Sequence, residues 1–204
     1  MPQPLLHSLV AALLCSLLLF VGAGKAQGQI PVEFFAGHER TTIDVMFFRF
    51  FKNKARENSP FLFFNRQRAA VDYRQTASSY LPQFGSTQAL SYNHRALKGI
   101  APVVVGQVLN RGVFGRGGIQ YAHVAPTLTI FSWAVVEFAR TPDIDVFLLL
   151  RYTPKLSEKW QLFTQLELVN VLPSDAAADF YFTQRLRLGA KRGDWQFGAG
   201  GDLL

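Results

Sequence analysis

Histidine and serine side chains are the first candidates for chemistry in this sequence. Three histidines follow residue 26, and a histidine can act as general base for a serine when the two lie within hydrogen-bond reach. Ser86 and His94 share the same face of an extended chain, but eight residues place them roughly 26 Å apart. No serine lies within four residues after His94 or His123. We therefore expect no catalytic residue, and a lipid-acting hydrolase stays open as an alternative.

Metal and cofactor sites have no clear sequence signal. Cys15 is the single cysteine, and no two histidines are four residues apart. Asp143 and Asp145 follow a proline, which is typical of a solvated turn. The run Gly115–Gly118 lacks the Lys-Ser/Thr of a phosphate loop and is interpreted as a bulge or a bend in a strand. The prediction is that the chain binds no metal and no cofactor.

A polar face near the C-terminus is the strongest candidate site. Charged and amide side chains recur there on one side of three consecutive segments, and they are Gln161, Gln165, Glu167, Arg185, Arg187 and Asp194. If the apolar sides face outward, these residues form a ladder of charge pairs along an interior. One interpretation is a pore or binding cavity that prefers anions. The other is an interior plugged by mutually neutralising charges, which a narrow barrel favours.

The segments that carry this face have the two-residue period of strands. In Asp179–Ala190 the apolar residues Phe180, Phe182, Leu186 and Leu188 alternate with polar ones. The same rule, with turn residues between, predicts about ten strands in an antiparallel up-and-down order. They are 42–51, 61–73, 86–95, 100–109, 113–123, 127–140, 144–153, 160–168, 179–190 and 195–200.

Strand length indicates a membrane barrel. Most of the expected strands have 9 to 14 residues, whereas soluble strands average about 5–6 and transmembrane strands need about 9–11. An extended chain in lipid must close into a barrel, so we predict an all-β transmembrane barrel of 8–12 strands. Interfacial aromatics are expected at Tyr73, Tyr152, Trp160 and Trp195. The alternative fold is a soluble exported barrel that binds an apolar ligand, as lipocalins do. For the single segment Ile43–Phe51, the alternative to a strand is an amphipathic helix at the membrane interface.

The N-terminus has the pattern of a signal peptide. Residues 9–21 form an apolar run of 13, too short to span a bilayer as a helix, and small residues follow at Gly22, Ala23, Gly24 and Ala26. We predict cleavage after Ala26, which leaves one domain, residues 27–204. Its formal net charge falls from +7 to +6, because Lys25 is removed. Cys15 would leave as well.

Composition excludes other classes. A chain that is 49% hydrophobic and 14% aromatic is not disordered, and one cysteine forms no disulfide framework. Export argues against nucleic acid as the partner of the basic charge. We interpret a set of basic residues instead as a rim that meets lipid phosphates: Lys52, Lys54, Arg56, Arg66 and Arg68.

Two stretches carry a resemblance to a known class. FFAGHERTTIDVMFFRFF and RYTPKLSEKWQLFTQLELVN, within an exported meander of long strands, are similar to an uncharacterised family of small outer-membrane β-barrels of Gram-negative bacteria. The resemblance implies outer-membrane localisation, insertion by the barrel-assembly machinery, and a structural, binding or narrow-channel (porin-like) role. It carries no catalytic motif.

Overall fold

The structure, a computed structural model, describes residues 30–73, 83–110, 112–138, 142–175 and 180–203. The predicted signal peptide, with its cleavage site, lies outside the described residues. Pro31–Leu204 forms one compact unit. In the described part of this unit, no helix has the length and apolar character needed to cross a bilayer.

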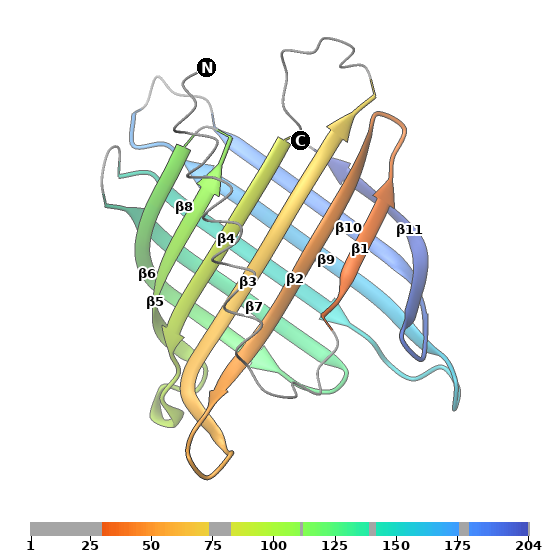
Figure 1. Ribbon diagram of the computed structural model, residues 1–204, viewed down its shortest axis with the longest axis horizontal. Helices are drawn as coiled ribbons and strands as arrows, with labels where there is room; N and C mark the ends of the chain where they lie inside the picture. Colours follow the sequence, from red (N-terminus) through yellow and green to blue (C-terminus); the bar gives the residue numbers. More distant parts are fainter. Residues whose placement is uncertain (1–29, 74–82, 111, 139–141, 176–179, 204) are drawn as a thin grey trace. The chain divides into compact units, whose positions relative to one another are not determined.

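Eleven antiparallel strands follow one another along a single sheet in sequence order (Figure 1). They are β1 (Val32–Ala36), β2 (Arg40–Lys52), β3 (Asn58–Asp72), β4 (Gln83–Tyr92), β5 (Ile100–Leu109), β6 (Gly112–Val124), β7 (Leu128–Glu137), β8 (Ile144–Tyr152), β9 (Gln161–Leu172), β10 (Tyr181–Arg192) and β11 (Trp195–Leu203). A one-turn 3₁₀ helix, η1 (Arg95–Leu97), joins β4 to β5. The predicted all-β, up-and-down antiparallel fold is confirmed.

Three details differ from the sequence expectation. The prediction missed β1, whose five residues are too few to establish an alternation. The segment Ile43–Phe51 is a strand rather than a helix, as favoured. The strand expected to end at Arg95 ends at Tyr92, because His94 caps η1 and Lys98 adopts a left-handed conformation.

The bulge alternative at Gly115–Gly118 is wrong. β6 keeps continuous register with β5 through these residues, and with β7 from Arg116 onward. Gly117 serves packing instead, because a Cβ atom there would lie within 3.0 Å of the Phe138 ring. The one register shift recorded among the described strand pairs lies between Phe50 and Lys52.

The sheet curls into a half-barrel with an apolar outer face. On β10, for example, Leu186 and Leu188 are more than half exposed, whereas Thr183 and Arg187 on the opposite face are buried. The same alternation on β3–β9 turns every charged side chain of these strands inward. These inward residues are Arg66, Arg68, Asp72, Arg116, Glu137, Asp145, Arg151 and Glu167.

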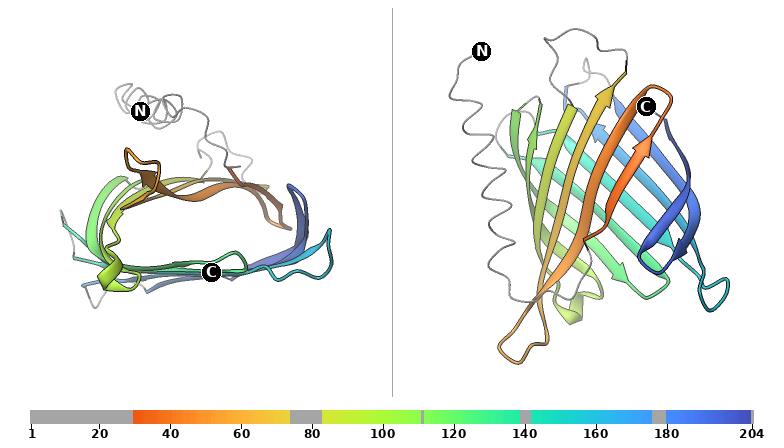
Figure 2. Two further views of the ribbon diagram at one scale, coloured as in Figure 1. Left: turned by 90° about the horizontal axis from the view of Figure 1, so that it is seen from below. Right: turned by 45° about the vertical axis from the view of Figure 1, so that its right-hand side comes forward.

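Apolar side chains fill part of the concave interior. Phe64 on β3 stacks on Phe131 of β7 at 5.2 Å between ring centroids, and Trp133 lies edge-on to both rings. The buried cluster around them comprises Met46, Leu62, Ala89, Val103, Val105, Val135, Phe147 and Leu149. These contacts join strands that lie on opposite walls when the sheet is viewed end-on (Figure 2).

The first and last strands lie at the two edges of the sheet. β1 pairs with β2 and β11 with β10, and no β1–β11 backbone pairing is recorded among the described residues. Side chains bridge the two edges instead. Arg187 on β10 contacts Glu33 on β1 at 3.0 Å. We call this boundary between β1 and β11 the seam.

Candidate functional site

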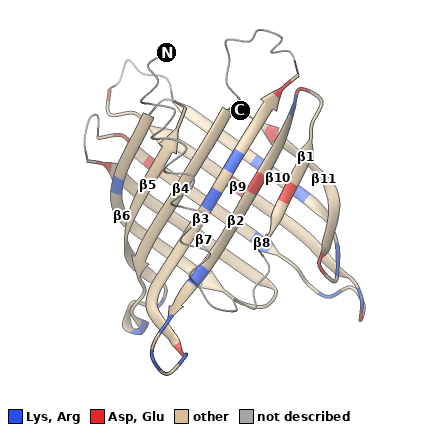
Figure 3. Ribbon diagram, viewed as in Figure 1, with Lys and Arg blue, Asp and Glu red and all other residues tan. Residues whose placement is uncertain are grey.

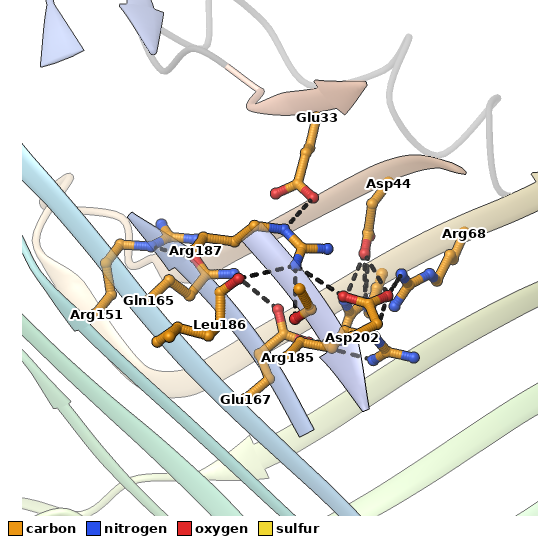
Figure 4. A network of polar contacts seen from close by, with 12 residues as sticks. Glu33, Asp44, Arg68, Arg151, Gln165, Glu167, Arg185, Leu186, Arg187 and Asp202 are labelled. Carbon is orange, nitrogen blue, oxygen red and sulfur yellow. Dashed lines mark hydrogen bonds and ion pairs between the residues drawn. The ribbon is translucent and has the colours of Figure 1, made fainter. Parts of the chain in front are cut away.

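A network of buried and partly buried charged side chains lies on the inward face of the sheet beside the apolar cluster. Figure 3 marks the positions of charged residues along the strands, and Figure 4 shows the side chains of the network. The network joins side chains from seven strands, and we call it the charge network. Its members are Glu33, Asp44, Arg66, Arg68, Arg151, Gln165, Glu167, Arg185, Arg187 and Asp202. Strand alternation places the members on β2, β3, β8 and β9 there, because they share the inward face of their strands with buried apolar residues.

Two arginines hold the closest ion pairs. Arg66 binds Asp44 on the neighbouring strand and lies 2.9 Å from Glu167 on β9, across the interior. Arg187 lies 2.7 Å from Asp202 and 3.0 Å from Glu33, and its guanidinium stacks over the Phe35 ring at 4.2 Å. Each of these arginines therefore has two carboxylate partners.

The other arginines have weaker partners. Arg68 lies 3.3 Å from Asp202, and Arg185 lies 3.4 Å from Glu167 and 3.5 Å from Asp202. Nη1 of Arg68 and Nε of Arg185 are buried without a hydrogen-bond partner in the described structure. Both side chains depend on carboxylates that already bind Arg66 or Arg187 more closely. The network thus sets five arginines against four carboxylates.

A separate buried ion pair joins Arg116 on β6 to Asp145 on β8. Arg116 is 1% exposed, binds Asp145 and donates to Gln107 at 2.7 Å. Trp133 Nε1 donates to the same aspartate at 3.2 Å. Asp145, expected in a solvated turn, is therefore an interior ligand of Arg116. Asp143 does accept from the Ser174 amide in a turn, at 3.0 Å.

The interior contains an open cavity of about 600 Å³ between the charge network and the aromatic residues. Phe64, Trp133 and Phe147 line it together with apolar residues of β5 and β9. Four arginines also line it: Arg66, Arg68, Arg116 and Arg185. We call this space the arginine cavity. A smaller cavity of about 170 Å³ lies at the seam.

Four of the six residues predicted to form a polar ladder lie together in the structure. The structure brings Arg185, Arg187, Glu167 and Gln165 together in the charge network. Gln161 lies half-buried at the start of β9. Asp194 was expected on the ladder but is exposed in the β10–β11 turn, because the strand ends at Arg192.

Sequence reasoning missed most partners of that ladder. The rim assignment of Arg66 and Arg68 is wrong, because both side chains face the interior, only 12% and 17% exposed. Asp44, Arg66 and Arg68 share strand parity with buried Met46 and Phe64, and this signal was available in the sequence. The contacts of Glu33 and Asp202 had no such signal, because they depend on how the sheet curls.

The predicted interfacial aromatics lie at strand ends. Tyr152, Trp160 and Trp195 are 48%, 37% and 72% exposed at the end of the sheet that holds the β8–β9 and β10–β11 connections. Arg192 stacks over the Trp160 ring at 5.4 Å. Tyr73, 50% exposed, follows β3 at the opposite end.

The histidines have local contacts. His94 Nδ1 accepts from the Ala96 amide at 3.3 Å, and its ring stacks on Tyr92. His38 lies in the β1–β2 turn, 3.6 Å from Glu39. No serine–histidine hydrogen bond and no cluster of metal-ligating side chains is recorded for the described residues.

Comparison of the chain with protein-family models, curated proteins and solved structures gives no match.

Proposed function

We propose that this chain is an integral outer-membrane β-barrel of a Gram-negative bacterium, exported by a cleaved signal peptide. Its interior is occluded, and its role is to bind a molecule rather than to conduct one. The absence of charged side chains from the outward faces of β3–β9 is the observation that carries the proposal.

The outer face supports insertion into lipid. A soluble barrel places charged residues on its outer surface, because they keep it soluble and prevent large apolar patches. Here Val104 on β5, Val113 and Ile119 on β6, and Leu188 on β10 are each more than half exposed. Ten of the strands have 9 to 15 residues, which suits a tilted span of the hydrocarbon core.

The interior supports occlusion. The stacked rings of Phe64 and Phe131 fill one part of the space between opposite walls. The ion pair between Arg66 and Glu167 connects β3 to β9 in another part. An open pore needs a continuous water-filled path, and these contacts interrupt it.

The test begins with extraction of membranes from cells that express the full chain. Protein that stays in the pellet after alkaline carbonate and after urea supports an integral barrel. Release into the soluble fraction would contradict insertion and favour the exported ligand-binding barrel.

The retained protein is then purified and placed in a planar bilayer. We expect no stable conductance step, because side-chain contacts between opposite walls interrupt the path through the interior. A reproducible ohmic step would contradict occlusion and favour a narrow channel.

A further inference from the structure

The arginine cavity has an unusual pairing of surfaces. One part is aromatic, with Trp133 packed against Phe147 at 5.0 Å and against Phe64 at 5.3 Å. The other part presents guanidinium groups from β3, β6 and β10. A volume of about 600 Å³ lies within the usual range for small-molecule sites.

The guanidinium groups are not equally neutralised. Arg66 and Arg116 each hold a close carboxylate, so they are satisfied without a ligand. Arg68 and Arg185 flank the same oxygen of Asp202, at 3.3 and 3.5 Å, and that residue lies closer to Arg187, at 2.7 Å. Their other carboxylate contacts, Arg68 to Asp44 at 3.9 Å and Arg185 to Glu167 at 3.4 Å, go to residues that Arg66 holds more closely. Four arginines and one carboxylate, Asp145, are the charged residues that line the cavity, so its wall carries a net positive charge.

Donors that make no hydrogen bond lie at the same wall. Nη1 of Arg68, Nε of Arg185 and the hydroxyl of fully buried Thr183 have no hydrogen-bond partner within the described part of the chain. Burial of unpaired charges and donors costs free energy unless a partner is supplied. A carboxylate or phosphate supplies both the charge and the acceptor oxygens, and guanidinium groups match that geometry.

We propose that the arginine cavity binds an organic anion with an apolar body, held by Arg68 and Arg185 at its carboxylate or phosphate and by the aromatic residues along its length. The proposal deepens the binding role proposed above. It does not depend on membrane insertion, because detergent-solubilised protein retains the cavity.

Trp133 reports on the occupancy of the cavity. The sequence has three tryptophans, at positions 133, 160 and 195, and the other two lie outside the arginine cavity. In the full chain carrying Trp160→Phe and Trp195→Phe, fluorescence comes from Trp133 alone. A bromoalkyl chain quenches this fluorescence on contact, so 11-bromoundecanoate is the probe and 11-bromoundecanol its neutral match.

We expect saturable quenching by the carboxylate at a half-saturating concentration about ten- to hundredfold below that of the alcohol, the range that a charged hydrogen bond gives. Arg68→Gln with Arg185→Gln should raise the carboxylate value to that of the alcohol. Arg49→Gln, which removes an exposed arginine of β2 outside the cavity, should leave it unchanged. Equal quenching by acid and alcohol, or quenching that survives the double substitution, would overturn the proposal.

A second arm identifies the source of the anion. The same single-tryptophan protein is placed in vesicles of phosphatidylglycerol with brominated acyl chains. Quenching that depends on Arg68 and Arg185 there supports a lipid phosphate as the ligand, whereas quenching by the free acid alone supports a carboxylate solute. Near-ultraviolet circular dichroism of each variant checks folding, and membrane extraction tests insertion separately from this site.

Discussion

Glu167 shows why single residues matter in this interior. Its side chain is 3% exposed and serves three partners: Arg66 at 2.9 Å, Arg185 at 3.4 Å, and the amide of Gln165 at 2.7 Å. Removing one member of a buried charge pair leaves the other charge uncompensated, which costs more than the pair contributes. The network already holds more arginines than carboxylates, so the loss of this carboxylate has no substitute.

Glu167→Gln should therefore lower the free energy of unfolding by about 3–5 kcal/mol. The measurement is urea unfolding of the detergent-solubilised protein, followed by tryptophan fluorescence. Arg185→Gln alone should change it by less than about 1 kcal/mol, because its ion-pair contacts are all 3.4 Å or longer.

The double variant is the control for this assignment. If Arg185 carries surplus charge, Glu167→Gln with Arg185→Gln should be more stable than Glu167→Gln alone, since fewer uncompensated charges remain buried. Additive losses would show that the two side chains do not interact.

Contacts between single residues could be predicted from the sequence where the two residues lie on consecutive strands. Arg185 and Glu167 occupy directly paired positions of adjacent strands, so alternation and strand order suffice to bring them together. Arg187 and Glu33 are 154 residues apart and meet because the sheet curls. No local pattern encodes that curvature, and Glu33 was not recognised.

Strands are the elements at which the sequence is most informative. The bounds predicted for β5, Ile100–Leu109, are those that the structure has, because turn residues flank this segment on both sides. The five residues of β1 were missed, because so short an alternation also occurs in connecting segments. Alternation divides the residues of a strand between two faces, but it does not say which face lines the interior of the sheet. That assignment rests on the apolar outer face itself.

The outer face of β5 gives a test at the same scale. Val104, 62% exposed in the middle of β5, should tolerate arginine poorly, with a loss of about 2–4 kcal/mol, because a lipid-facing charge at the bilayer midplane has that cost. Val113, 69% exposed near the start of β6, should lose about 0–1 kcal/mol on the same substitution. Both are measured by urea unfolding in phospholipid vesicles.

A soluble outer surface gives a different result. An exposed valine in water accepts arginine within about 0.5 kcal/mol at either position. Equal, small effects of Val104→Arg and Val113→Arg would therefore contradict a lipid-facing β5.

At the scale of the whole molecule, the seam is the distinctive feature. In an up-and-down sheet of eleven strands, the first and last strands run in the same direction, so a closing ladder would be parallel. Among the described residues, side-chain ion pairs rather than backbone hydrogen bonds connect the two edge strands. Arg187 reaches from β10 across β11 to Glu33, and Asp202 on β11 holds it midway.

Gly200 on β11 makes this reach possible. It is paired directly opposite Arg187, and a Cβ atom there would lie 2.6 Å from Cδ and 2.9 Å from Nη1 of that arginine, and 2.6 Å from the backbone oxygen of Leu186. Any side chain at position 200 must therefore displace Arg187 from its path to β1 and push β11 away from the β10 backbone. The next residue, Gly201, has open space where its Cβ would stand.

Gly200→Ala should loosen the seam, and Gly201→Ala should not. We expect the first substitution to lower the free energy of unfolding by about 1–3 kcal/mol, as overpacking does, and the second to leave it unchanged or raise it by about 0.5 kcal/mol.

Spin labels at Val32→Cys on β1 and Ala199→Cys on β11, with Cys15 replaced by serine, report the distance across the seam by pulsed electron resonance. The distance distribution should broaden in Gly200→Ala and stay as in the parent for Gly201→Ala. Unchanged distances in both variants would mean that β1 and β11 are held by something other than Arg187.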